Sequence, residues 1–304
     1  MEEMLDVRQT AGRIVDMRIR GAGRIARSVA LALAVYAERF QGDDLAAFKS
    51  GLDSSVRELA ATRPTAVSLS NAVGLVSRSA KSAATVADAK EFVIRAAREF
   101  AASSGTAVER VAKVAATRVP AKARVLTHCN SSAAVASIIR AHRDGGVEAY
   151  CTETRPWRQG RITARELADA GVPVTMVVDS AVGLLMPKMN AVLVGADAVE
   201  WDGSLLNKVG TVQLACAAAR CKVPLICCAE SYKFVPPSQR GKRREIEFRE
   251  SLEVLDGVDL PGVSIWNPVF DRTPPELVTV YATEHGECAP AGALDFSRMH
   301  LEGL

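Results

Sequence analysis

The sequence of 304 residues has few aromatic side chains, which account for only 5% of it, and it lacks long apolar runs. No stretch reaches the ~18 consecutive apolar residues that a membrane-spanning helix requires. The first residues, Met1-Glu-Glu-Met-Leu-Asp6, are acidic and lack the basic and apolar segments of a signal peptide. We therefore expect a cytoplasmic protein with no membrane partner. Because 48% of the residues are nevertheless hydrophobic, with Ala and Val abundant, we also expect an aliphatic core.

Neither the charge nor the cysteines indicate a nucleic acid or a metal. The formal net charge of +3 is small for a nucleic-acid-binding protein, and the one dense basic run, at residues 242–244, is flanked by acidic residues. The seven cysteines form no CxxC pair, and there are only four histidines. A zinc site and a disulfide framework are therefore not predicted, and we expect free thiols and no nucleic-acid partner.

The periodicity of apolar residues divides the chain into two regions. Up to about residue 115 it predicts an all-α region, with helices at residues 7–18, 24–40, 44–61, 66–78 and 86–114. After Val119-Pro120 short apolar runs alternate with helical segments. Strands are predicted at residues 124–127, 147–152, 174–178, 191–194, 225–228 and 278–282, and helices at 132–144, 163–170, 182–186 and 206–220. This alternation predicts an α/β fold with a doubly wound parallel sheet, and two domains, 1–118 and 119–304.

The segment from Val125 to Ala136 places a thiol between a predicted strand and a predicted helix. Cys129 follows the strand, and a polar turn then leads into a helix that begins with small residues. In open α/β sheets ligands bind outside the carboxyl ends of the strands, and the backbone N–H groups at a helix N-terminus attract anions. The helix dipole can also lower the pKa of a neighbouring thiol. Packing is the alternative, because cysteine is often buried, but this setting favours Cys129 as a group that acts on a phosphorylated small molecule.

A carboxylate stands at the end of another predicted strand. Asp197 follows the apolar run of residues 191–194 and the pair Gly195-Ala196. An Asp in this position often caps a loop or a helix, but it can also exchange protons with a substrate. Together with Cys129 on another strand end, it forms a candidate acid–base pair.

Several basic and glycine-containing segments are candidates for binding phosphate. Arg20-Gly-Ala-Gly23 interrupts two helices, Arg63 precedes a helix start, and Lys233 follows a strand. Asn207 and Lys208 are predicted to begin a helix. Each of these residues alone is more often a surface charge or a cap, whereas together they suit a ligand with two phosphates. None of the glycines forms a G-x-G-x-x-G fingerprint or a P-loop, which argues against NAD binding and ATP hydrolysis.

Eight short motifs occur in order along the chain. They are Ile19-Arg-Gly-Ala-Gly23, Arg63-Pro-Thr-Ala-Val67, Thr127-His-Cys-Asn130, Glu153-Thr-Arg-Pro156, Gly160-Arg-Ile-Thr163, Val194-Gly-Ala-Asp197, Asn207-Lys-Val-Gly-Thr211 and Asn267-Pro-Val-Phe-Asp-Arg-Thr-Pro-Pro275. With these motifs the chain resembles the superfamily that joins methylthioribose-1-phosphate isomerase, archaeal ribose-1,5-bisphosphate isomerase and the regulatory subunits of the exchange factor for eukaryotic translation initiation factor two. The resemblance covers nearly the whole chain. It implies a Rossmann-like C-terminal domain after the helical one, and a homo-oligomer that is a dimer or a trimer of dimers (a hexamer).

Within this superfamily the motifs are most similar to those of the ribose-1,5-bisphosphate isomerases. The regulatory subunits generally lack the catalytic cysteine and aspartate that Cys129 and Asp197 match. At the positions where this chain has Arg20-Gly-Ala-Gly23 and Cys129-Asn-Ser-Ser132, the motifs of methylthioribose-1-phosphate isomerases resemble Arg-Gly-Ala-Pro and Cys-Asn-Ala-Gly. The resemblance thus implies conversion of α-D-ribose 1,5-bisphosphate to ribulose 1,5-bisphosphate in the salvage of nucleoside monophosphates. Methylthioribose-1-phosphate isomerase and a non-catalytic regulatory subunit remain the alternatives.

The resemblance also implies a set of site residues. Cys129 and Asp197 would be catalytic, with no metal or redox cofactor. Substrate would be bound by Arg20, Gly21, Ala22, Gly23, Arg63, Ser131, Ser132, Ala133, Asn207, Lys208 and Lys233. Allosteric activation by a nucleotide such as AMP is suggested by the family alone.

Overall fold

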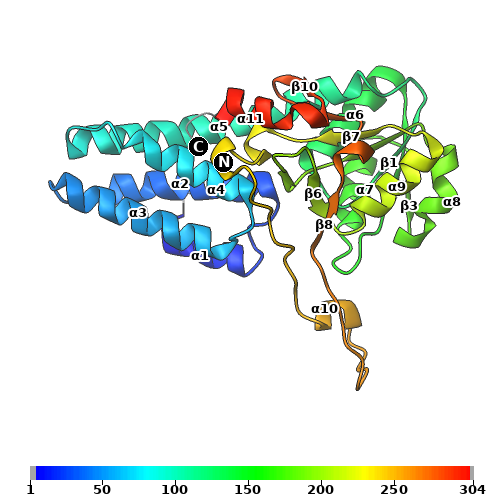
Figure 1. Ribbon diagram of the computed structural model, residues 1–304, viewed down its shortest axis with the longest axis horizontal. Helices are drawn as coiled ribbons and strands as arrows, with labels where there is room; N and C mark the ends of the chain where they lie inside the picture. The colour runs from blue at the N-terminus through cyan, green and yellow to red at the C-terminus, as the bar shows by residue number, and fades with distance from the viewer. Residues whose placement is uncertain (1–4, 302–304) are drawn as a thin grey trace. The chain divides into compact units, whose positions relative to one another are not determined.

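The computed structural model describes residues 5–301, which form two compact units (Figure 1). The first unit comprises the residues up to Thr106 together with Leu301, and the second runs from Ala107 to His300. The division falls inside the long helix α5. The domain limits 1–118 and 119–304 stay a prediction.

The first unit is all-helical, as the periodicity predicted. Its helices are α1 (Val7–Val15), α2 (Ala22–Arg39), α3 (Leu45–Thr62), α4 (Val67–Ser79) and the first two thirds of α5 (Val86–Ala116). Polar caps fix where the helices begin: the Asp6 side chain accepts a hydrogen bond from the Gln9 backbone, and the Asp44 side chain accepts one from Ala46 at 2.8 Å. The buried face of α2 is rich in Ala and Val, so α2 packs closely against α4.

The second unit is built on a seven-stranded sheet in the order β10-β9-β7-β4-β1-β2-β3. Its strands are β1 (Arg124–Thr127), β2 (Glu148–Thr152), β3 (Val174–Val177), β4 (Ala191–Val194), β7 (Leu225–Cys228), β9 (Val280–Thr283) and β10 (Gly286–Cys288). All neighbouring pairs are parallel except β9 and β10. Counted along the chain, the six parallel strands have the order 3-2-1-4-5-6 of a doubly wound sheet. The predicted fold class is confirmed.

Helices connect the parallel strands. They are α6 (Ser132–Gly145), α7 (Gly160–Asp169), α8 (Val182–Leu185) and α9 (Thr211–Cys221), followed by α10 (Leu252–Leu255) and α11 (Ala293–Leu301). Short 3-10 turns lie at Asp179–Ala181, Met186–Lys188, Ser231–Lys233, Pro237–Gln239, Pro275–Leu277 and Pro290–Gly292. The core between the sheet, α6, α7 and the end of α5 is made of Ala, Val, Leu and Ile side chains and Cys228, including the fully buried Val125, Ile138 and Leu193. This part of the core is aliphatic, as the composition predicted.

In this unit one sequence prediction was wrong, and two strands of a small second sheet were not predicted. Residues 206–208 form a strand, β6 (Leu205–Lys208), and the following helix begins only at Thr211. The motif at residues 267–275, for which no strand was predicted, contains β8 (Phe270–Thr273), and β6 pairs antiparallel with both β8 and β5 (Ala198–Val199). The apolar residues of β6 are buried in this small sheet, and such a short apolar run does not by itself distinguish a strand from a helix.

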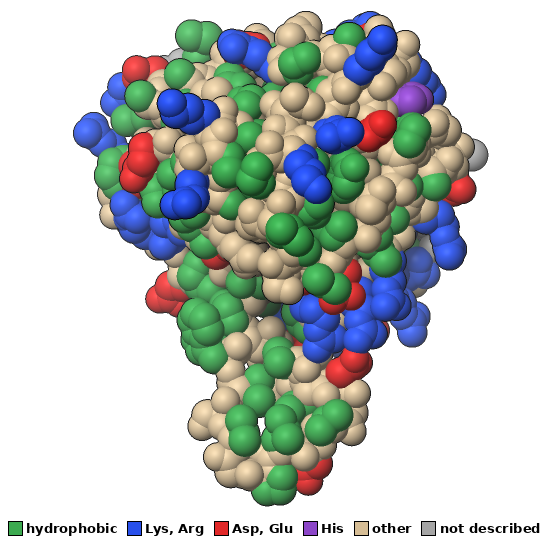
Figure 2. Space-filling view, turned by 90° about the vertical axis from the view of Figure 1, so that its right-hand side faces the viewer, with side chains coloured by type: hydrophobic (Ala, Val, Ile, Leu, Met, Phe, Trp, Pro, Cys, Tyr) green, Lys and Arg blue, Asp and Glu red, His purple; other side chains and the backbone are tan. Residues whose placement is uncertain are grey.

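Residues 240–268 form an arm of the second unit that carries α10 (Figure 1). Arg155 and Arg158, from the loop after β2, make ion pairs with Asp256 of the arm. The arm also carries several exposed apolar side chains, which are visible at the bottom of Figure 2. They are Phe248, Leu252, Val258, Leu260, Val263 and Trp266. None of the helices in the described part of the chain is long and apolar enough to cross a membrane.

Candidate functional site

The order of the strands reverses between β1 and β4, which are neighbours in the middle of the sheet. Cys129 follows the end of β1 by two residues, and Asp197 follows the end of β4 by three. In a doubly wound sheet the crevice at this switch point is the usual ligand site. The topology therefore brings the predicted thiol and carboxylate to the same place, although 68 residues (197 − 129) separate them in sequence.

Cys129 has a left-handed backbone conformation, with φ +66°. Only glycine adopts this region without strain, so a cysteine there has to be held by its surroundings. The Cys129 N–H donates to Oγ1 of Thr154 at 2.8 Å, and the Oγ1 hydroxyl of Thr163 donates to the Cys129 carbonyl at 2.7 Å. The peptide groups on both sides of the thiol are therefore hydrogen-bonded to buried side chains.

Burial raises the pKa of the Cys129 thiol to about 11. The positive charge of Lys208 lowers this pKa, and the negative charges of Asp197 and Asp179 raise it. The expectation that the helix N-terminus would depress the pKa is wrong for this structure, because the cost of burying a thiolate is larger. At neutral pH Cys129 is a protonated thiol, so it can donate a proton before it accepts one.

Asp197 interacts electrostatically with the Cys129 thiol after β1 and with the Lys233 ammonium after β7. Its backbone N–H donates to the Leu206 carbonyl at 3.0 Å, which attaches the end of β4 to β6. Its negative charge raises the pKa of the Cys129 thiol and also that of the Lys233 ammonium. The partly buried carboxylate therefore acts electrostatically on both a proton donor and a cation.

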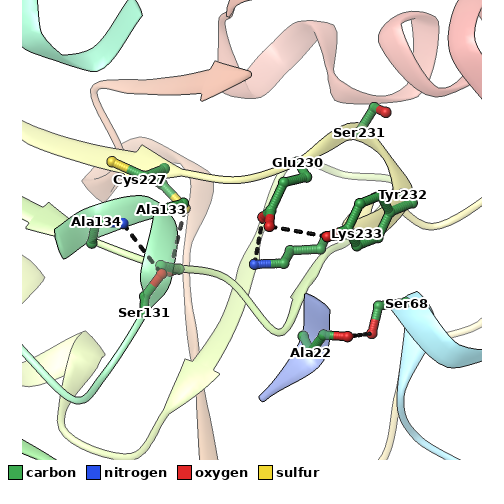
Figure 3. Close-up of polar contacts among 12 residues, drawn as sticks. Ala22, Ser68, Ser131, Ala133, Ala134, Cys227, Glu230, Ser231, Tyr232 and Lys233 are labelled. Carbon is green, nitrogen blue, oxygen red and sulfur yellow. Dashed lines mark hydrogen bonds and ion pairs between the residues drawn. The ribbon is translucent and has the colours of Figure 1, made fainter. Parts of the chain in front are cut away.

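Lys233 lies in a buried ion pair after β7 (Figure 3). Its Nζ is 2.6 Å from Oε2 of Glu230, and the Tyr232 hydroxyl donates to Oε1 of Glu230 at 3.0 Å. The two side chains of the pair are 6% and 1% exposed. Glu230 raises the pKa of Lys233, and Lys233 lowers that of Glu230, in each case against the effect of burial. Both groups are thus charged at neutral pH.

Replacing Glu230 by glutamine is expected to lower the free energy of unfolding by about 3–5 kcal/mol, because the ammonium of Lys233 loses its buried counter-charge. Urea unfolding of the purified variant measures this. The exposed Glu245→Gln is the matched control and should stay within about 0.5 kcal/mol of the wild type. Adding Lys233→Met to Glu230→Gln should recover most of the loss. Equal stability of Glu230→Gln and Glu245→Gln would contradict this account of the pair.

The residues at the start of α6 that are predicted to bind substrate lie at the same switch point. Ser131 caps the helix by accepting a hydrogen bond from the Ala134 N–H at 3.4 Å. Its side chain packs against Gly195, where an added Cβ would lie 2.3 Å from Ser131 Oγ. Ser132 is exposed and Ala133 is buried in the first turn of the helix. The absence of a side chain at Gly195 thus lets the N-terminus of α6 approach the end of β4.

Asn207 and Lys208 lie at the end of β6 and not at a helix start, which corrects the prediction for them. The buried Asn207 side chain donates to Oγ1 of Thr211 at 3.0 Å, and the Lys208 ammonium is 5.2 Å from the centre of the Phe270 ring. The helix that follows is capped by Asp271, whose carboxylate accepts from the Gly210 N–H at 2.7 Å. Burial raises the pKa of Asp271 to about 6.

The remaining predicted substrate contacts lie in the first unit, which is described by itself. Arg20 is exposed, and Gly21 caps α2 with φ +84°. The Ser68 hydroxyl donates to the Ala22 carbonyl at 3.1 Å, so the Arg20–Gly23 segment lies beside α4. Arg63 is the C-cap of α3 and is partly buried. Their role in binding substrate stays a prediction.

Several residues that the structure places around Cys129 and Lys233 could not be selected from the sequence alone. Thr154 and Thr163 belong to motifs noted in the sequence, but nothing in those motifs says that they touch Cys129. Glu230 is three residues from Lys233 in sequence, and this spacing is the local signal from which the ion pair could have been predicted. Among the described residues no group of three His, Cys, Asp or Glu side chains could hold a metal ion.

The fold and the site define a doubly wound α/β protein whose switch point carries a thiol, a carboxylate and lysine side chains, as suits an anionic small molecule. Residues 18–290 match the model of the initiation factor 2 subunit family. The chain belongs to this family.

Full-length relatives carry two different enzyme names. Ribose 1,5-bisphosphate isomerase of Thermococcus kodakarensis is 39% identical over 98% of this chain and 95% of that protein. The protein of the same name from Methanocaldococcus jannaschii is 41% identical over 96% and 94%, respectively. Methylthioribose-1-phosphate isomerase of Populus trichocarpa is 36% identical over 93% and 84%.

Solved structures have the same fold. The translation initiation factor eIF-2B of Pyrococcus horikoshii superposes with a TM-score of 0.80 at 27% identity, over 93% of this chain and 97% of that chain. The 5-methylthioribose 1-phosphate isomerase of the same organism gives a TM-score of 0.79 at 30% identity, over 98% and 88%.

Proposed function

We propose that this chain is a sugar-phosphate aldose–ketose isomerase, an intramolecular oxidoreductase, that converts α-D-ribose 1,5-bisphosphate to ribulose 1,5-bisphosphate. The observation that carries the proposal is the pairing of Cys129 with Asp197 at the ends of adjacent strands, beside cationic side chains. The 39–41% identity to full-length relatives named ribose 1,5-bisphosphate isomerase supports this substrate.

The reaction needs a proton donor first, because the phosphate on C1 prevents the sugar from opening as a free aldose does. In the proposed mechanism the neutral Cys129 thiol protonates the ring oxygen as the bond between that oxygen and C1 breaks. The resulting thiolate removes the proton from C2, which gives an enol, and returns this proton to C1.

Asp197 completes the proton balance. Its carboxylate takes the proton from the hydroxyl on C2 as the C2 carbonyl forms, and this proton then restores the Cys129 thiol. The negative charge of Asp197 raises the pKa of Cys129 and so favours the protonated thiol with which the cycle starts. Net, the ring oxygen and C1 each gain a proton, and C2 and its hydroxyl each lose one. We propose that no metal or redox cofactor takes part.

Substrate binding is proposed to use cations and helix N-termini. Lys208 and Lys233 would contact phosphate oxygens, each charge-assisted contact contributing about 1.5–3 kcal/mol. The start of α6 and Asn207 would add hydrogen bonds. The other proposed contacts are Arg20, Gly21, Ala22, Gly23 and Arg63 of the first unit and Ser131, Ser132 and Ala133 of the second.

The deciding experiment is incubation of the purified protein with ribose 1,5-bisphosphate, with and without AMP, followed by phosphorus NMR. Formation of ribulose 1,5-bisphosphate supports the proposal, and heat-denatured protein is the control. Turnover of methylthioribose 1-phosphate instead would support the alternative function, that of the Populus trichocarpa enzyme to which the chain is 36% identical. Binding without turnover of either sugar would favour a non-catalytic regulatory subunit.

Four further features belong to the proposal: location, metabolic role, oligomeric state and regulation. We expect a cytoplasmic protein that takes part in nucleoside monophosphate salvage. We expect a homo-oligomer, either a dimer or a trimer of dimers. A higher rate with AMP in the experiment above would indicate allosteric activation.

A further inference from the structure

Two motifs noted in the sequence, at residues 153–156 and 160–163, have no part in the proton transfers described above. Each contributes a threonine with 0% exposure that is bonded to the Cys129 backbone, Thr154 on the N–H side and Thr163 on the carbonyl side. Together they hold the peptide groups of a residue whose φ is +66°. Their hydroxyls therefore stabilise a backbone conformation that a cysteine otherwise avoids.

The direction of the hydrogen bonds around Thr154 follows from His128. Burial lowers the pKa of His128, so its imidazole is neutral and carries one N–H. Its Nε2 is 2.8 Å from the Val209 carbonyl oxygen, which can only accept, so the hydrogen is on Nε2. Nδ1 must then accept from the Thr152 hydroxyl, at 2.6 Å.

The same reasoning extends to Cys129. Because the Thr152 hydroxyl donates to His128, the hydrogen bond between the two threonine hydroxyls, at 3.2 Å, runs from Thr154 to Thr152 Oγ1; the Thr152 carbonyl oxygen is a second, longer acceptor for the Thr154 hydroxyl, at 3.4 Å. A lone pair of Thr154 Oγ1 is left to accept the Cys129 N–H. The resulting chain of hydrogen bonds runs from Cys129 through Thr154 and Thr152 to His128. In each of these bonds the donor belongs to the residue nearer to Cys129 in the chain of bonds.

Both ends of this chain are attached to other parts of the second unit. The Thr154 N–H donates to Asp179 Oδ1 at 2.8 Å, which fixes the threonine backbone after β2. At the other end, the His128 ring packs on Gly210, where an added Cβ would lie 2.9 Å from the ring. Val209 directly follows Lys208, so the chain connects the Cys129 backbone with a segment that carries a proposed phosphate contact.

We propose that Thr154 and Thr163 are positioning residues that hold the Cys129 thiol in the place where it can exchange protons with the substrate. Thr154 is itself held by the hydrogen bonds that connect it to Thr152 and His128. The expected effect of these threonines on turnover rests on the proposed function, whereas their expected effect on the reactivity of the Cys129 thiol does not. Neither threonine needs to touch substrate.

The test compares Thr154→Val, which keeps the shape but removes the hydroxyl, with Thr154→Ser, which keeps the hydroxyl. Thr154→Val should lower kcat at least ~10-fold while KM changes less than ~3-fold, because misplacing a reacting group affects turnover more than binding. The Cys129 thiol of this variant, no longer held in its partly buried place, should become more acidic, since burial is what raises its pKa to about 11. Alkylation of Cys129 by iodoacetamide at pH 8, followed by mass spectrometry of the Cys129 peptide, should accordingly be faster. Thr154→Ser should resemble the wild type in both measurements.

Thr175→Val, at an exposed position on β3, is the matched control and should change neither measurement. Wild-type kcat and wild-type alkylation in Thr154→Val would overturn the proposal. If Thr154→Val does not fold, Thr163→Val decides in its place by the same two measurements. If the wild type does not isomerise ribose 1,5-bisphosphate, the proposed function fails, and alkylation still decides whether the threonines hold the thiol.

Discussion

Replacing Cys129 by serine is expected to lower kcat for ribose 1,5-bisphosphate by about 10²–10⁴-fold, the usual contribution of a well-placed acid–base group. A serine hydroxyl fits the same space but is a far weaker acid than a thiol, even one whose pKa is about 11. Steady-state assays of ribulose 1,5-bisphosphate formation measure the change. KM should move little, because the phosphates are bound by other residues in the proposed site.

The control for this variant is Cys216→Ser, which changes an exposed thiol on α9 and should leave kcat unaffected. Thermal melting of both variants should match the wild type, since serine adds no volume in either place. Wild-type turnover by Cys129→Ser would remove the thiol from the mechanism. Activity should also persist to alkaline pH, because a proton donor with a raised pKa stays protonated until the pH approaches that value.

Asp197→Asn is expected to lower kcat by a similar factor of about 10²–10⁴, because an amide cannot take the proton from the C2 hydroxyl. The variant also has an electrostatic signature that can be measured without substrate. The negative charge of Asp197 raises the pKa of the Cys129 thiol, so removing it should lower that pKa. The pH dependence of iodoacetamide alkylation at Cys129 should therefore shift to lower pH.

Asp169→Asn, at an exposed position at the end of α7, serves as the comparison for Asp197→Asn. It should change neither turnover nor the alkylation profile. An Asp197→Asn protein with full activity would show that another group moves the hydroxyl protons. A lowered kcat with an unshifted alkylation profile would mean that Asp197 acts on substrate without influencing the thiol.

Much of the fold followed from patterns that are local in sequence. The strands at residues 124–127, 191–194 and 225–228 were predicted with the bounds that the structure has, because short buried runs between polar turns have few alternatives. The helices of the first unit were predicted to within a few residues at each end from apolar periodicity. By contrast the sequence predicts a helix start where β6 lies, since its partner β8 lies more than sixty residues later and the apolar run is too short to show its period.

For the candidate site the sequence by itself determined which groups stand at strand ends and helix starts, because alternating elements place Cys129, Asp197 and Lys233 at one edge of a parallel sheet. Only the tertiary structure decided how those groups behave. Burial raised the pKa of the thiol that the helix start was expected to lower, and Glu230 keeps a charged lysine in the interior. The threonines that hold Cys129 come from another strand end and from α7. Burial, charge pairing and hydrogen bonding between distant residues depend on distances in space, which a sequence pattern does not contain.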